Sequence, residues 1–137
     1  MAGEVKLTDN SPQYLSELQK SIEAAMEACA TQAESHAKSI ITREKRVDTG
    51  MLRNSVAHTV SGDTAYIGSN LDYAVYNELG TGIYASQGGG RQTPWFYKDR
   101  NGVTHRTRGM KPIHFLKRAI EDYKDEYKSI MERIMKQ

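Results

Sequence analysis

The side chains best suited to catalysis or metal binding are scattered through this sequence. Asp72 and Glu78 come nearest to a carboxylate pair, but six residues apart on a short helix they would point in different directions. No histidine has a second ligand at the i,i+4 spacing of a metal-binding helix, and the four are His36, His58, His105 and His114. We therefore expect structural roles for these residues, with no catalytic residue, no metal and no cofactor.

Two further features with chemical potential have simpler interpretations. Gly88–Gly90 is followed by Arg91 and Gln92, whereas a phosphate-binding loop continues with Lys and Ser or Thr at the start of a helix. Cys29 lies near Ala33 on an apolar helical stripe and is expected to be a small buried core residue. A lone thiol excludes an internal disulfide and fits a reducing cytoplasm.

Charge is distributed unevenly along the chain. The net charge of the 137 residues is +2, but residues 86–118 carry eight Lys or Arg and one Asp. The flanking segments, residues 1–85 and 119–137, are both slightly acidic. A basic middle segment of this kind suits a phosphate backbone, an acidic partner subunit or simply solvent.

Much of the basic charge falls on a predicted β-hairpin. Asn101-Gly102 between two strand-favouring runs is a strong hairpin signal. Its aromatic residues beside cations superficially resemble a platform that stacks single-stranded bases. Alternate strand residues point to opposite faces, however, so at least one of Trp95, Phe96 and Tyr97 is expected in the core. The candidate contacts to a partner or to DNA are Arg91, Lys98, Arg100, Arg106 and Arg108.

The elements that would position this hairpin follow from hydrophobic periodicity. Residues 13–46 form one apolar helical stripe after Ser11-Pro12, which cap and open a helix. Such a helix is too long for this chain to cover alone, so we expect either one helix that packs partly against a neighbour or two helices with a break. The other predicted elements are strands at 55–60 and 64–68, a short helix at 72–79, a flexible loop at 83–94 and one helix after Pro112.

These elements predict a single α+β domain over residues 1–137, with residues 1–10 disordered. A long N-terminal helix, an antiparallel sheet built from hairpins and a C-terminal helix packed on that sheet would make up the fold. Residues 1–9 contain no apolar run, and no segment approaches the length of a membrane span. We therefore expect no signal peptide and no membrane partner.

Three clusters occur in an order and spacing that resemble a known family. They are V-D-T-G-M-L-R-N-S at 47–55, Y-A-V-Y-N-E-L-G-T-G at 73–82 and M-K-P-I-H-F-L at 110–116. The set resembles the tail-component family of lambda-like long-tailed bacteriophages, over about residues 40–137. The third cluster departs by two extra residues before Phe115, and the basic hairpin is longer than in many relatives.

The resemblance implies a non-enzymatic virion protein of a phage or prophage that multimerises at the neck. It would join or complete the tail for attachment to the DNA-filled head, as a ring in contact with a head connector, tail terminator or tail tube. Its location would be the head–tail interface, and the bacterial host cytoplasm during assembly. The hairpin would face DNA in the channel or, slightly favoured, an acidic protein surface.

The resemblance also implies roles for single residues. Arg53 and Glu78 would form a charge pair between the first two clusters, Gly50, Gly80 and Gly82 would supply turns, and the last helix would be anchored through its first two residues. The residues that carry the resemblance are Asp48, Thr49, Gly50, Leu52, Arg53, Tyr73, Tyr76, Glu78, Gly80, Pro112, Phe115 and Leu116.

Two other functions stay open from the residues alone. A small nucleic-acid-binding module could use the basic hairpin at 95–108, because attraction to phosphate needs no motif. A small hydrolase is disfavoured because the sequence offers no nucleophile–base set.

Overall fold

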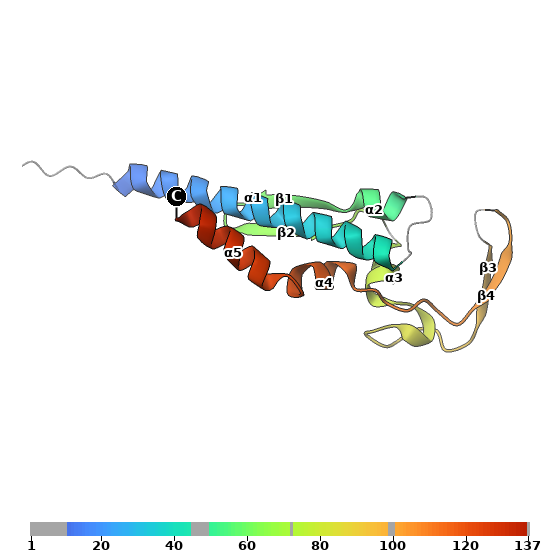
Figure 1. Cartoon of the computed structure of the whole chain (residues 1–137). Coiled ribbons are helices and arrows are strands. Elements are labelled where there is room, and N and C mark those ends of the chain that lie inside the picture. Colours follow the sequence, from blue (N-terminus) through green and yellow to red (C-terminus); the bar gives the residue numbers. More distant parts are fainter. Residues whose placement is uncertain (1–10, 45–49, 72, 99–100, 137) are drawn as a thin grey trace, which may run out of the picture.

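The computed structural model describes residues 11–44, 50–71, 73–98 and 101–136. Its helices and strands occur in a mixed order that confirms the α+β class (Figure 1). In chain order they are α1 (Ser11–Arg43), α2 (Met51–Ser55), β1 (Ala57–Ser61), β2 (Thr64–Gly68), α3 (Ala74–Leu79), η1 (Gly82–Tyr84), β3 (Trp95–Lys98), β4 (Thr104–Thr107), α4 (Phe115–Glu121) and α5 (Lys124–Met135).

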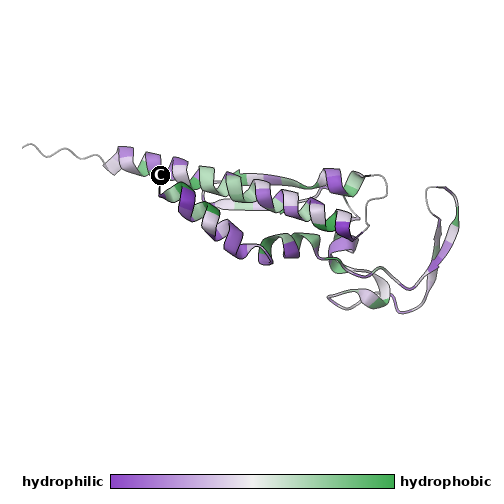
Figure 2. Ribbon diagram, viewed as in Figure 1, coloured by the Kyte–Doolittle hydropathy of each residue, from purple (hydrophilic) through white to green (hydrophobic). Residues whose placement is uncertain are grey.

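The long helix α1 is the central element, because β1, β2, α4 and α5 all pack against it. Its buried residues are spaced three and four apart and are mostly small, which lets the neighbouring elements approach closely. They are Ala25, Cys29, Ala30, Ala33, Ala37, Ile40 and Ile41. Hydrophobic and hydrophilic residues alternate along α1, α4 and α5, as expected for helices that bury one face (Figure 2).

The first turns of α1 are not covered by the rest of the described chain. Tyr14 is 64% exposed and Leu15 is 60% exposed, and the helix start extends beyond the other elements (Figure 1). At 33 residues the helix is about 50 Å long. The expectation that one helix exceeds what this chain can cover is therefore confirmed.

The first predicted hairpin, β1–β2, is confirmed, although its first strand begins at Ala57 and not at residue 55. The strands are antiparallel, from Ala57 opposite Gly68 to Ser61 opposite Thr64. His58 and Val60 lie on the more buried side, whereas Tyr66 is 61% exposed on the other. Alternation along the strands thus puts one face on α1 and leaves the other open.

The hydrophobic core lies where α1, α2, α3, the first hairpin and α4 meet. Phe115 at the start of α4 is fully buried, which confirms its predicted role. Ile67 of β2 and Leu116 pack against the same core, so α4 is joined to the hairpin as well as to α1. The buried members are Ala37, Ile40, Ile41, Leu52, Val56, Ala74, Ile113, Phe115 and Ala119.

The prediction of one C-terminal helix is wrong, because the chain forms α4 and then α5. The break falls at Asp122 and Tyr123, and the Tyr123 backbone (φ −119°, ψ 21°) is not helical. The Tyr123 ring stacks on His36 of α1 at a centroid distance of 3.5 Å. This break lets α5 turn and follow α1.

The second predicted hairpin is confirmed, but it forms a sheet of its own. β3 pairs with β4 from Trp95 opposite Thr107 to Lys98 opposite Thr104, and no described strand joins this pair to β1–β2. We call residues 95–98 and 101–109 the arm. The arm stands at one end of the molecule, apart from the packed body (Figure 1).

Three local details differ from the predictions or extend them. Residues 51–55 form the short helix α2, which the sequence did not indicate. The inward residues of α3 are Ala74 and Asn77, whereas Tyr73 and Tyr76 are exposed. The mobility of residues 83–94 stays a prediction, although η1 covers the start of that segment.

Among the described residues, no helix combines the length and apolar character that crossing a bilayer requires.

Candidate functional site

The arm is held to the body by backbone pairing at its base. The Thr81 N–H donates to the Met110 carbonyl at 2.9 Å, and the Ile83 N–H donates to the Arg108 carbonyl at 3.0 Å. The Met110 N–H donates in turn to Thr81 Oγ1 at 2.8 Å. Gly82 has a φ of 61°, and a Cβ there would lie 1.9 Å from the Arg108 oxygen, so the close approach requires glycine.

The outer face of the arm combines cations with one aromatic ring. Cross-strand register places Phe96 directly opposite Arg106 and Lys98 opposite Thr104, so these four residues share a face. Phe96 is 70% exposed. Arg108 comes directly after β4, between Thr107 and Gly109, which both border a hollow on the other side of the arm. Lys98, Arg106 and Arg108 are all exposed, and no ion pair among the described residues involves them.

The expectation that one arm aromatic lies in the core is wrong. Trp95 is half-buried, Phe96 is largely exposed and Tyr97 is 49% exposed. The physical reason is that neither face of the arm is covered by a helix or by the other sheet in the described part of the chain. Exposure of the arm's basic residues, by contrast, was predicted and is confirmed for those that the structure describes.

The inner face of the arm borders a hollow of about 670 Å³. The Tyr97 ring stacks on His105 across the two strands at 5.2 Å. The Arg91 guanidinium lies over the Trp95 ring at 5.5 Å, and its Nε donates to Thr93 Oγ1 at 3.1 Å. The hollow is lined by Tyr76, Thr81, Trp95, Tyr97, Thr107, Gly109 and Met110.

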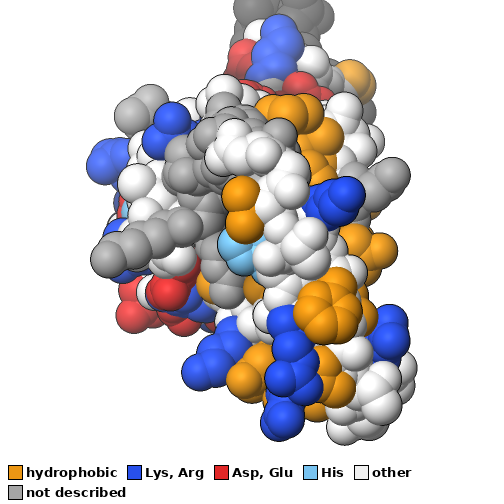
Figure 3. All heavy atoms as spheres, turned by 90° about the vertical axis from the view of Figure 1, so that its right-hand side faces the viewer, with side chains coloured by type: hydrophobic (Ala, Val, Ile, Leu, Met, Phe, Trp, Pro, Cys, Tyr) orange, Lys and Arg blue, Asp and Glu red, His pale blue; other side chains and the backbone are white. Residues whose placement is uncertain are grey.

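Of the five predicted contact residues, the structure brings three together and separates one. Lys98, Arg106 and Arg108 belong to the outer face, whereas Arg91 is associated with Trp95 on the inner side. Arg100 lies outside the described residues. Basic and hydrophobic side chains gather side by side over this end of the molecule, with acidic side chains toward its edge (Figure 3).

The first motif cluster serves the fold around α2. Gly50 precedes α2 with a φ of 82°, and its carbonyl accepts the Asn54 N–H at 2.9 Å. Leu52 is buried in the core. Arg53 donates to Thr42 Oγ1 of α1 at 3.5 Å. Asp48 and Thr49 lie outside the described residues.

Glu78 does not pair with Arg53, so the predicted charge pair between the first two clusters is wrong. Its carboxylate instead accepts the backbone N–H groups of Leu116 at 2.8 Å and Lys117 at 3.0 Å. His114 Nδ1 lies 4.0 Å away. These N–H groups belong to the first turn of α4, which has no side-chain cap of its own. Glu78 therefore caps α4 from a distant part of the sequence.

The second and third clusters are in direct contact. The Ile113 N–H donates to the Asn77 carbonyl at 2.8 Å. Gly80 has a φ of 79°, and a Cβ there would lie 2.8 Å from Cδ of Pro112 and 2.9 Å from the Met110 carbonyl oxygen. Tyr73 and Tyr76 are 39% and 52% exposed beside this junction. The positive φ predicted for Gly50, Gly80 and Gly82 is confirmed.

Two histidines contact carboxylates of other elements and so tie those elements together. His36 Nε2 lies 2.8 Å from the Glu126 carboxylate and so links α1 to α5. His58 of β1 lies between two carboxylates of α1, at 2.6 Å from Glu27 and 3.3 Å from Glu34. The hydrogen bond to Glu27 is the main cause that raises the pKa of His58 above its usual value.

The lone cysteine and its neighbour are packed residues, as expected for Cys29. The thiol donates to the Tyr127 carbonyl at 3.5 Å, and burial, with a smaller effect of Glu126, raises the pKa of Cys29. Burial also raises the pKa of Tyr127 to about 12, and its hydroxyl donates to the Ala119 carbonyl. Within the described ranges no three His, Cys, Asp or Glu side chains gather as metal ligands.

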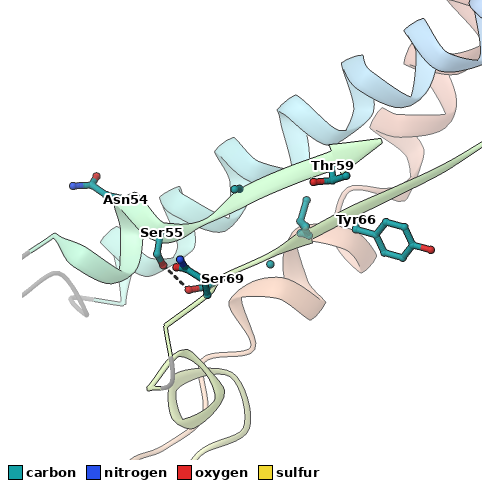
Figure 4. Close-up of a pocket in the computed structure, with 9 residues that line it drawn as sticks. Asn54, Ser55, Thr59, Tyr66 and Ser69 are labelled. Carbon is teal, nitrogen blue, oxygen red and sulfur yellow. Dashed lines mark hydrogen bonds between the residues drawn. The ribbon is translucent and has the colours of Figure 1, made fainter. Parts of the chain in front are cut away.

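A second, shallow hollow of about 660 Å³ lies on the open face of the first hairpin. Asn54, Ser55 and Ser69 lie at one end of it, and Thr59 and Tyr66 at the other (Figure 4). The Ser55 and Ser69 hydroxyls are joined by a hydrogen bond of 2.5 Å. The lining mixes apolar side chains with hydroxyl and amide groups and contains no charged residue, so this hollow offers no catalytic or metal-binding set.

Comparison with known proteins gives no match. No family model, no curated protein and no solved structure matches this chain. A functional assignment therefore rests on the motifs of the sequence and on the geometry of the arm.

Proposed function

We propose that this chain is a non-enzymatic structural protein of a tailed bacteriophage or prophage. It multimerises at the neck of the virion and joins or completes the tail for attachment to the DNA-filled head. The observation that carries the proposal is the arm. It projects from a packed body and exposes Phe96 together with three cations that no described acidic side chain neutralises.

The junction between the motif clusters supports this proposal. The arm leaves the body between the second and third clusters, and its C-terminal end is fixed where Thr81 and Ile83 pair with Met110 and Arg108. Thr81 of the second cluster and Met110 of the third thus help to hold the arm. A contact surface on a firm mount is what a joining protein needs, because a flexible one would lose more entropy on docking.

The two ends of the molecule also suit a ring. The start of α1, with Tyr14 and Leu15 exposed, and the arm lie at opposite ends of an elongated subunit (Figure 1). Contacts between two different surfaces are heterologous, and they generate a ring when the rotation closes. The partners beyond the ring would be the head connector, the tail terminator or the tail tube.

Deletion of the gene from its phage or prophage tests this proposal. We expect the lysate to contain filled heads and complete tails that remain separate, and purified protein should restore infectious particles when added. Complete particles without the gene would contradict the proposal. Arrest of virion assembly before the head is filled, or before tails form, would also contradict the proposal.

A second candidate function is a nucleic-acid-binding module that works outside any virion. The exposure of Phe96 beside Arg106 favours it, since the argument against a nucleic-acid surface was that one arm aromatic would be buried. The same deletion separates the two functions. A stand-alone module would leave heads and tails joined normally.

A further inference from the structure

We propose that the outer face of the arm binds the sugar–phosphate backbone of duplex DNA, with Phe96 against the groove wall. This inference rests on the proposed function, because it names the partner that the arm meets when the neck is assembled on a DNA-filled head. It chooses DNA over the acidic protein surface that the sequence alone slightly favoured.

The charge of the outer face favours phosphate over protein. Lys98, Arg106 and Arg108 lie on one side of a two-stranded ribbon, and the described part of the arm contains no acidic residue. Asp99 is the sole acidic residue in the sequence from 95 to 108. Burying several like charges in a protein interface carries a desolvation cost of several kcal/mol per ion. Binding to DNA instead releases condensed counterions and needs no opposing carboxylate.

The spacing of the cations fits a regular polyanion. Residues two apart on a strand are separated by about 6.8 Å and point the same way. Arg106 lies on β4, and Arg108 follows two residues later, directly after the strand ends. Lys98 lies on the neighbouring strand of the same face. A ribbon of two strands is narrow enough to enter the major groove of B-DNA, which is about 12 Å wide. The arm can do so because it stands apart from the body (Figure 1).

The distribution of aromatic residues favours duplex over single-stranded DNA. Proteins that bind single strands stack successive bases on several aromatic rings of one surface. The outer face offers Phe96 alone, because Trp95 and Tyr97 lie on the inner face beside the hollow. One exposed apolar ring among cations suits a contact with the groove wall, while the cations hold the phosphates.

Fluorescence anisotropy with the full-length chain and a labelled duplex of about 30 base pairs tests the inference, between about 50 and 200 mM salt. The variant Lys98→Gln/Arg106→Gln removes two outer-face cations. Lys124→Gln/Lys128→Gln is the matched control, since it removes the same charge from exposed positions of α5. A labelled single strand of equal length and a polyglutamate peptide are the competing probes.

We expect the duplex to bind the wild-type chain and the α5 variant similarly. The arm variant should bind at least about tenfold more weakly, and the slope of log K against log salt should fall by about 2, roughly one for each lost phosphate contact. Phe96→Ala should weaken binding without changing the slope, because it removes an apolar contact and no charge.

Three results would overturn the inference. One is the absence of duplex binding by the wild-type chain, and another is an equal loss in the arm and α5 variants, which would mean diffuse attraction alone. The third is tighter binding of the polyglutamate peptide or the single strand than of the duplex. Failure of the proposed function is measured separately, because it would appear as normal head–tail joining in the deletion strain. If joining is lost in the deletion strain but the chain does not bind DNA, the partner of the arm is an acidic protein.

Discussion

The two phenylalanines of this chain occupy opposite environments, one in the body and one on the arm. Phe115 starts α4 and is fully buried between α1, the first hairpin and α2, whereas Phe96 on β3 is 70% exposed. Both residues are apolar and both begin or belong to a regular element. What differs is the presence of a covering element, since nothing described packs on the outer face of the arm.

The comparison separates stability from recognition. In the body, burial of small residues on α1 brings helices and strands together, and the free energy of folding comes from this packing. On the arm, the same kind of side chain is left in water, where it adds little to stability and is available to a partner. Each prediction below tests one side of this division.

Replacing Phe115 should have the largest effect on stability. Phe115→Ala is expected to lower the free energy of unfolding by about 3–5 kcal/mol, because it leaves a cavity in the core. Phe96→Ala is the matched control and should change it by less than about 0.5 kcal/mol. Denaturant unfolding measures both. The contrast between the two phenylalanines would be contradicted if Phe115→Ala lowered the free energy of unfolding by less than about 1 kcal/mol. It would also be contradicted if Phe96→Ala lowered it by about 3–5 kcal/mol, as expected for a core residue.

The next effect concerns the cap that ties α3 to α4. Glu78→Ala removes the acceptor of two backbone N–H groups and should cost about 1–2 kcal/mol. Glu121→Ala, at an exposed carboxylate at the end of α4, is the control and should be near neutral. Equal effects in the same unfolding experiment would show that the contacts of Glu78 with Leu116 and Lys117 contribute nothing.

A change at the mount should affect the arm more than the body. Gly82→Ala places a methyl group against the Arg108 carbonyl and is expected to break the pairing there. Hydrogen exchange should show faster exchange at the Ile83 amide, while global unfolding shifts by less than about 1 kcal/mol because the core lies elsewhere. Gly88→Ala, at an open position, is the control. An unchanged Ile83 amide would mean that the mount tolerates a side chain.

The smallest effect should be a pH dependence from His58. Its pKa is raised in the folded state, chiefly by Glu27, so the folded state holds the proton more tightly than the unfolded chain. The resulting stability is fully present below the unfolded pKa of about 6.5 and is lost as pH rises through the higher folded pKa. Lys38, which lies 3.6 Å from Glu34, competes for that carboxylate.

Thermal unfolding of wild type and His58→Gln across pH measures this contribution. The gap in melting temperature between them should be widest below about pH 6 and should shrink toward about pH 8. The control is His105→Gln, on the exposed arm, and its difference in melting temperature from wild type should change little across the same pH range. A gap that widens with rising pH would mean that His58 is neutral in the folded protein.

Much of the fold could be predicted because local patterns decided it. The stripe of α1, both hairpins and the burial of Phe115 follow from spacing, turn residues and periodicity. The break between α4 and α5 was missed, since the apolar stripe runs on through Tyr123. At the break, the Tyr123 ring stacks on His36, which is far away in the sequence. The role of Glu78 was missed for the same reason, because its partners lie 38 and 39 residues further on.

The candidate site was predictable in composition but not in exposure. Lys98 and Arg106 fall on the same face of two paired strands, so their common face could have been derived from the hairpin register. Whether Phe96 is buried depends on a covering element, and that depends on where the whole hairpin sits relative to the body. No local pattern contains this information.

The account depends most on the claim that the outer face of the arm is the surface that joins. Lys98→Glu/Arg106→Glu should fold with an unchanged melting temperature, because exposed charges contribute little to stability. Added to an extract of filled heads and free tails from the deletion strain, the variant should restore few infectious particles, whereas wild type and Lys124→Glu/Lys128→Glu restore many. Normal restoration by the arm variant would show that the arm is only a solvated surface.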